Sequence, residues 1–164
     1  MPRVRHAGII HAPLHEVWAA LNDIAHTPEW VVGLERAELI SPDEFGRGSV
    51  YIDYNRLGPF PQKTTWCITE FEPTVCQVHV SSSAIIPTTM TLGLTLAPGG
   101  TRLEFTVDYQ FLPRFGALGR FLERTVMNRM IGSVITQNLA NLDKRLAQRD
   151  PVATMTDSYT AVQA

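Results

Sequence analysis

The chain has 164 residues, of which 45% are hydrophobic and 18% are charged, a composition typical of one globular domain. Its 14 lysine and arginine residues against 16 aspartate and glutamate residues give a net charge of −2, without a basic patch for a nucleic-acid backbone. No segment approaches the roughly 18 consecutive apolar residues of a membrane span, and the first residues lack an apolar signal core. These features predict a soluble, cytoplasmic protein with no nucleic-acid partner and no integral membrane segment.

The first predicted elements are a strand and two short helices. Residues 4–10 suit a short strand. A helix begins near Pro13, because proline is favoured in the first helical turn and the residues that follow show helical spacing of apolar side chains. A second short helix over residues 23–30 is predicted to break at Pro28, since the residue before a proline is pushed out of the α region.

From about residue 32 onward the period becomes two, which predicts an antiparallel sheet. Alternation assigns one set of side chains to the inner face of this sheet, and none of them is charged or a histidine. The set consists of Val50, Ile52, Tyr54, Thr64, Trp66, Ile68, Cys76, Val78, Val80, Met90, Leu92, Leu94, Leu96, Leu103, Phe105, Val107, Tyr109 and Phe111. The same alternation sends Asp53, His79 and Asp108 to the outer face.

The last predicted element is one long helix that follows Pro113 and ends near Gln148. Its apolar residues form two stripes that are offset at Gly132, where such a helix can bend along a curved sheet. The stripes are Leu118, Leu122, Val126 and Met130, and then Ile131, Ile135, Leu139, Leu142 and Leu146. Residues 1–148 are thus expected to form a single domain, and residues 149–164, which lack periodicity, a disordered tail.

A sequence pattern near the N-terminus resembles a known superfamily. The pattern consists of Ile10, Ala12-Pro13, Val17-Trp18, Leu21 and Asp23, then Pro28-Glu29-Trp30 and Gly46-x-Gly48. It resembles the opening of the SRPBCC superfamily, which includes START-like lipid-transfer domains, the birch-pollen-allergen (Bet v 1-like) fold and proteins called polyketide cyclase/dehydrase. The resemblance implies an α+β helix-grip fold, in which a curved antiparallel sheet wraps around the long C-terminal helix. It also implies an apolar cavity between sheet and helix.

Two functions of different classes fit such a cavity. The favoured one is binding or transport of a hydrophobic small molecule, such as a lipid, an isoprenoid or a polyketide-like compound, without a cofactor. The alternative is a polyketide cyclase/dehydratase-type enzyme, which needs a proton donor and acceptor facing the substrate. The inner face as predicted holds no such pair, and this favours binding. A third possible function is a partner-binding module with the same fold. The sequence is compatible with either a monomer or a dimer.

The candidate site residues follow from the predicted inner face and the first half of the long helix. The predicted ligand-binding residues are Tyr54, Trp66, Val78, Met90, Leu92, Tyr109, Phe111, Leu118, Leu122 and Val126. For an enzyme, the candidate catalytic residues are Tyr54, Glu70, His79 and Tyr109. Because no predicted inner-face group titrates near neutrality, ligand affinity is expected to stay nearly flat between about pH 5.5 and 8.5.

The cysteines and histidines give no metal site. Cys67 and Cys76 fit neither a disulfide framework nor zinc spacing, and we expect two free thiols that point to opposite faces of the sheet. His11 and His15 are four residues apart, but Pro13 interrupts the helical face that they would share. The sequence therefore predicts no bound metal.

Overall fold

The computed structural model describes residues 2–41, 44–57, 60–81, 87–109 and 117–148. Their elements are, in chain order, β1 (Arg3–Ile10), α1 (Leu14–Asn22), the 3₁₀ helix η1 (Ile24–Glu29), β2 (Leu34–Leu39), β3 (Val50–Leu57), β4 (Phe60–Glu72), β5 (Cys76–Ser81), β6 (Thr88–Ala97), β7 (Gly100–Tyr109) and α2 (Ala117–Ala147). This order agrees with the predicted one. The predicted tail over residues 149–164 lies outside the described residues.

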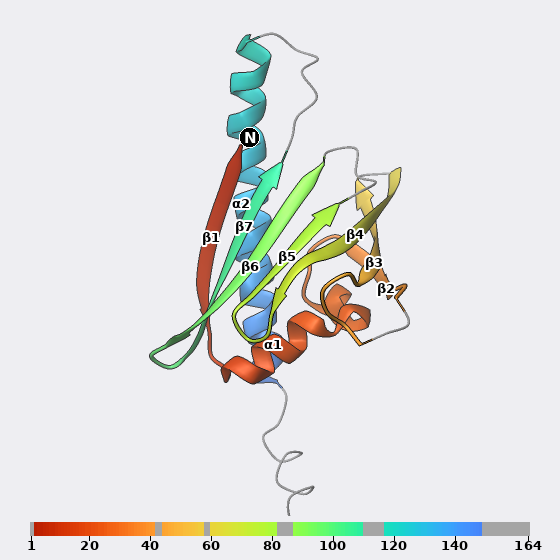
Figure 1. Cartoon of the computed structure of the whole chain (residues 1–164). Coiled ribbons are helices and arrows are strands. Elements are labelled where there is room, and N and C mark those ends of the chain that lie inside the picture. Colours follow the sequence, from red (N-terminus) through yellow and green to blue (C-terminus); the bar gives the residue numbers. More distant parts are fainter. Residues whose placement is uncertain (1, 42–43, 58–59, 82–86, 110–116, 149–164) are drawn as a thin grey trace, which may run out of the picture.

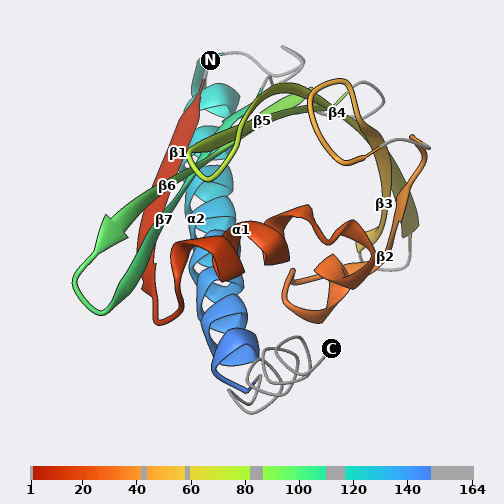
Figure 2. The same ribbon diagram turned by 60° about the horizontal axis from the view of Figure 1, so that its bottom comes forward.

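Seven antiparallel strands form one curved sheet in the order β1-β7-β6-β5-β4-β3-β2. The long helix α2 lies beside β1 and β7 inside the curve, and β2 and β3 curl round to the opposite side of the molecule (Figures 1 and 2). The helices α1 and η1 cross between these two sides (Figure 2). This arrangement confirms the helix-grip fold.

The second predicted stripe of α2 forms part of the core, whereas the first stripe faces solvent where it is described. Leu142 is completely buried, while Val126 is 62% and Met130 is 48% exposed. Gly132 lies where α2 approaches β1, and a Cβ atom there would lie 2.6 Å from Nε2 of His6. The glycine therefore permits close helix–strand contact, a role different from the predicted bend.

Alternation predicted the wrong face for two strands. In β3 the inward residues are Tyr51 and Asp53 instead of Val50, Ile52 and Tyr54. In β5 they are the buried Gln77, His79 and Ser81 instead of Cys76, Val78 and Val80. The reason is cross-strand pairing, because paired residues share a face. Trp66 and Ile68 of β4 do point inward, and they pair with Tyr51, Ser81 and His79.

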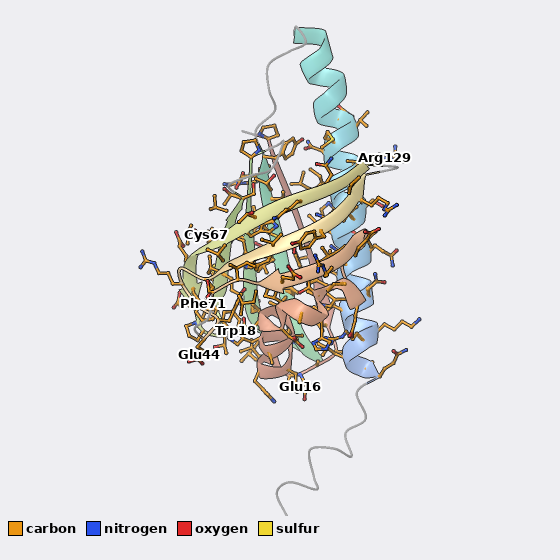
Figure 3. The ribbon with its side chains drawn as sticks, turned by 90° about the vertical axis from the view of Figure 1, so that its right-hand side faces the viewer. Glu16, Trp18, Glu44, Cys67, Phe71 and Arg129 are labelled. Atoms are coloured by element: carbon orange, nitrogen blue, oxygen red, sulfur yellow. The ribbon has the colours of Figure 1, made fainter. Side chains whose placement is uncertain are left out.

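An irregularity in β4 follows Ile68 and shifts the register by one residue before Glu70. It brings Phe71 to the inner face, where its ring packs on that of Trp18 from α1 with centroids 5.1 Å apart (Figure 3). Glu70 is exposed and does not reach the interior. A bulge of this kind bends a strand, as the curved sheet requires.

The two cysteines are free, as predicted, but the predicted reason is wrong. Cys67 pairs with Val80, and Val80 shares its face with Cys76 because the two are four residues apart in β5. Both thiols therefore lie on the outer face. They are separated by about 13 Å along the strand direction, at about 3.3 Å per residue, which is too far for a disulfide.

Two further predictions need correction. The helix η1 continues through Pro28 without a break, as a 3₁₀ helix whose Thr27 carbonyl still accepts a hydrogen bond from the Trp30 N–H at 3.2 Å. Leu96, predicted to point inward, is 81% exposed because the β6–β7 hairpin extends beyond the core (Figure 1). No helix among the described residues is long and apolar enough to cross a membrane.

Candidate functional site

A cavity of about 220 Å³ lies between the concave face of the sheet, η1 and α2. Its lining is mostly apolar and aromatic, with a few polar side chains on β3, β5 and α2. The lining residues are Leu21, Ile24, Thr27, Trp30, Val31, Leu34, Tyr51, Asp53, Asn55, Trp66, His79, Met90, Leu92, Phe105 and Asn138. An apolar cavity of about 150 Å³ holds a benzene molecule, so this one has room for a somewhat larger ring system.

The segment between η1 and β2 forms one wall of the cavity and is fastened to α2. Asn138 accepts a hydrogen bond from the Val32 N–H at 2.8 Å, and Asn141 donates one to the Trp30 carbonyl at 3.1 Å. One turn further along α2, Arg145 pairs with Glu29 at 2.6 Å. The spacing of these side chains places them on one helical face, which fixes the position of the wall.

A buried chain of hydrogen bonds runs from β3 through β5 to α1. The Tyr51 hydroxyl lies 2.8 Å from Nδ1 of His79, and Nε2 of His79 lies 3.0 Å from Oε1 of Gln77. The Gln77 amide donates to Oδ1 of Asn22 at 2.6 Å. Because Oε1 of Gln77 can only accept, His79 carries its hydrogen on Nε2, and Tyr51 donates to Nδ1.

Burial keeps both ring groups of this chain neutral. Desolvation lowers the pKa of His79 to about 4 and raises the pKa of Tyr51 well above its usual value. Asp53 adds to the rise at Tyr51, because a negative charge nearby disfavours the phenolate. At neutral pH the His79 imidazole is therefore an uncharged acceptor, which agrees with the direction of the hydrogen bonds.

Asp53 is the carboxyl group that faces the cavity. Burial raises its pKa from 3.8 to about 7, and the nearby Trp66 indole N–H lowers it in part, although the two groups lack hydrogen-bond geometry. The Oδ1 atom of Asp53 and the indole nitrogens of Trp66 and Trp30 are buried without a hydrogen-bond partner. The cavity wall therefore holds two unused donors and one unused carboxyl oxygen.

Some predicted ligand-binding residues lie in the cavity wall and others do not. Trp66, Met90 and Leu92 line it. Tyr109 is buried on the inner face but is not part of the lining, and its hydroxyl donates to Asn128 at 2.7 Å.

The remaining predicted residues either lie outside the cavity or are not among those whose side chains the structure describes. Tyr54 lies on the outer face, where its ring stacks under the Arg36 guanidinium at 4.1 Å and its hydroxyl donates to Glu38. Val78 shares this outer face, and Val126 is exposed. Phe111 and the side chains of Leu118 and Leu122 lie outside what the structure describes.

Among the candidate catalytic residues, only His79 faces the cavity, contrary to its predicted outward position. Sequence reasoning missed Tyr51, Asp53, Asn55 and Asn138. The signal that could have found the residues on β3 was Trp66, because its cross-strand partner must share its face. Alternation within β3 alone does not show which residue of β3 pairs with Trp66.

The chain has relatives in fold and family. A family model described as polyketide cyclase / dehydrase and lipid transport matches residues 1–147. The Zhui aromatase/cyclase from Streptomyces sp. R1128 is 16% identical, with a TM-score of 0.73 over 90% of this chain and 94% of that one. A START superfamily protein from Mycobacterium smegmatis is 13% identical, with a TM-score of 0.73 over 90% and 99%. At these identities the structural likeness establishes a shared fold. No curated protein sequence matches the chain.

Proposed function

Because the chain belongs to the family described as polyketide cyclase / dehydrase and lipid transport, we propose that it binds a hydrophobic small molecule in the cavity beside η1. The observation that carries this proposal is the partly open cavity of about 220 Å³, whose apolar walls come from the sheet, the helices α1 and η1 and the segment that follows η1. Apolar contact contributes about 25 cal/mol per Å² removed from water, so such a site needs no charged ligand group.

The size of the cavity narrows the ligand class. A lipid, an isoprenoid or a polyketide-like compound each presents apolar surface, but the space accommodates about one or two rings. A compact cyclic isoprenoid or polyketide-like molecule therefore fits better than a long acyl chain.

The proposal is tested by filling the cavity from β6. Met90 lines the cavity, whereas Leu96 on the same strand is 81% exposed. Met90→Trp is expected to abolish binding of naphthalene, measured by its fluorescence, while Leu96→Trp leaves the affinity unchanged. Native mass spectrometry of the purified protein should also detect a co-purifying hydrophobe in the parent and not in Met90→Trp. Equal naphthalene binding by both variants would contradict the proposal.

A second candidate function, proton transfer to or from a ketone, is favoured by one observation. Asp53 faces the cavity with a pKa of about 7, so the absence of an inward acid–base group, predicted from the sequence, is wrong. A carboxyl group with a pKa near neutrality suits general acid–base catalysis. In a cyclase/dehydratase-type reaction, Asp53 would take a proton from the carbon next to the ketone and then donate it to an oxygen atom of the substrate.

This second candidate has a direct test that needs no knowledge of the natural substrate. 2-Tetralone is a bicyclic ketone whose acidic protons exchange with D₂O, which NMR follows. An enzyme of this kind accelerates the exchange, and Asp53→Asn removes the acceleration. If 2-tetralone exchanges no faster with the protein than in buffer without it, the result contradicts this second function, and hydrophobe binding is the function that stays proposed.

A further inference from the structure

The cavity contains one donor and one acceptor that the protein leaves unpaired next to each other. Trp66 lies two residues beyond Thr64, the cross-strand partner of Asp53, so both side chains share the inner face. Nε1 of Trp66 and Oδ1 of Asp53 are both buried without a hydrogen-bond partner. The Trp66 ring is also stacked on that of Tyr51, with centroids 6.3 Å apart and 15° between planes, which restricts its orientation.

Of the other polar groups in the lining, Tyr51 and Asn138 are already engaged, whereas the Trp30 indole nitrogen is a further donor without a partner. Tyr51 donates to His79, and Asn138 accepts from the Val32 backbone. Buried polar atoms without partners are rare in folded proteins because each costs free energy of desolvation. Two such atoms side by side in a cavity indicate that a bound molecule supplies the missing partner.

The chemistry of the two atoms decides which ligand group can satisfy both. When Asp53 is ionised, an ether or ketone oxygen accepts from Trp66 but has no hydrogen for Asp53. A carboxylate also only accepts, and it would repel the Asp53 carboxylate. An ammonium group donates to Asp53 but cannot accept from the indole. A hydroxyl group both accepts and donates through one oxygen.

We propose that the ligand of this cavity is an alcohol or phenol whose hydroxyl accepts a hydrogen bond from Nε1 of Trp66 and donates one to the Asp53 carboxylate. This inference rests on the proposed function, binding of a small hydrophobic molecule. It adds the chemical group that the site recognises and excludes fatty-acid anions as preferred ligands. The other titratable groups in the lining, Tyr51 on the same strand and His79 on β5, are neutral and leave the carboxylate free to accept.

The test uses four ligands with one ring system: naphthalene, 2-methoxynaphthalene, 2-naphthol and 2-naphthoate. Their affinities are measured by calorimetry at about pH 8, where the Asp53 carboxyl is ionised. We expect 2-naphthol to bind about tenfold more tightly than 2-methoxynaphthalene, which has no hydroxyl hydrogen, and 2-naphthoate to bind most weakly. Equal affinities for naphthalene, its methyl ether and the naphthol overturn the inference but support the proposed function. Tightest binding of 2-naphthoate also overturns the inference, and no binding of any ligand overturns both.

Substitutions of Asp53 and Trp66 test whether these two residues cause the preference for 2-naphthol. Asp53→Leu and Trp66→Phe each remove one partner and should reduce the preference for 2-naphthol over its methyl ether to within about twofold. Tyr54→Phe is the matched control, because it removes a hydroxyl from the same strand on the outer face. A preference that persists in both cavity variants overturns the inference. If Asp53→Leu does not fold, the ligand series on the parent protein still decides.

Discussion

Strands β6 and β7 and strands β3 and β5 belong to one sheet but bury different chemistry. On β6 and β7 the inward side chains are Leu92, Leu94, Leu103 and Phe105, all buried against the helices. On β3 and β5 they are Tyr51, Asp53, Gln77 and His79. The first region belongs to the apolar core, and its Leu92 and Phe105 also form part of the apolar cavity wall. The second region supplies the polar part of that wall through Tyr51, Asp53 and His79, while Gln77 lies behind it in the hydrogen-bond chain to α1. One concave face therefore combines an apolar part, which packs on the helices, with a polar part, whose groups are paired in a buried hydrogen-bond chain or face the cavity.

The largest expected effect tests the apolar region. Leu103→Ala should lower the free energy of unfolding by about 2–5 kcal/mol, because Leu103 is completely buried and the change leaves a void. Leu96→Ala on the neighbouring strand is the control, and it should change stability by less than about 0.5 kcal/mol because the side chain is exposed. Urea denaturation measures both. Similar losses for the two variants would contradict the assignment of a core to this half of the sheet.

The sequence predicted the apolar region well, because hydrophobic alternation and burial coincide there. Leu103 and Phe105 alternate with the polar Arg102 and Glu104, and the structure confirms the predicted faces. The order of strands and helices and the second stripe of α2 were also predictable from hydrophobic periodicity, whereas the helix-grip arrangement was implied by the family resemblance.

The cavity wall was not predictable in the same way. In β3 the apolar residues that alternate with Tyr51, such as Ile52, lie on the outer face. The inward face of Tyr51 is fixed by its pairing with Trp66 on the neighbouring strand β4. In β5 the face of His79 depends on pairing with Ile68 just before the irregularity in β4. Neither the register nor the bulge leaves a signal within one strand. The family resemblance therefore implied that a cavity exists, but alternation within the strands placed the wrong polar groups in it.

The next largest effect concerns pH and the two titratable groups in the polar wall. The folded protein holds the Asp53 pKa at about 7 instead of 3.8, so between these values the folded state binds more protons than the unfolded state. This contribution lowers stability as pH rises, by up to about 4 kcal/mol in all, at about 1.4 kcal/mol per pKa unit. The folded protein holds the His79 pKa at about 4 instead of 6.5, so this contribution lowers stability as pH falls, by up to about 3 kcal/mol.

The two contributions oppose each other between about pH 4 and 6.5, and single variants separate them. In Asp53→Asn, stability relative to the parent should increase as pH rises from about 4 to 7. In His79→Gln, stability relative to the parent should increase as pH falls from about 6.5 to 4. Chemical denaturation at a series of pH values gives both slopes. Parallel pH curves for parent and variants would mean that these groups are not buried as described.

The smallest expected effects come from two tyrosines on one strand that lie on opposite faces. Tyr51→Phe removes the hydroxyl that donates to Nδ1 of the buried His79, and the unsatisfied acceptor should cost about 1–3 kcal/mol. Tyr54→Phe removes a hydroxyl bound to the partly exposed Glu38, while the ring can stay stacked with Arg36. That change should cost at most about 0.5 kcal/mol. Alternation of apolar residues predicts the reverse order, since it places Tyr54 inside, so thermal denaturation of this pair decides directly which face of β3 lines the cavity.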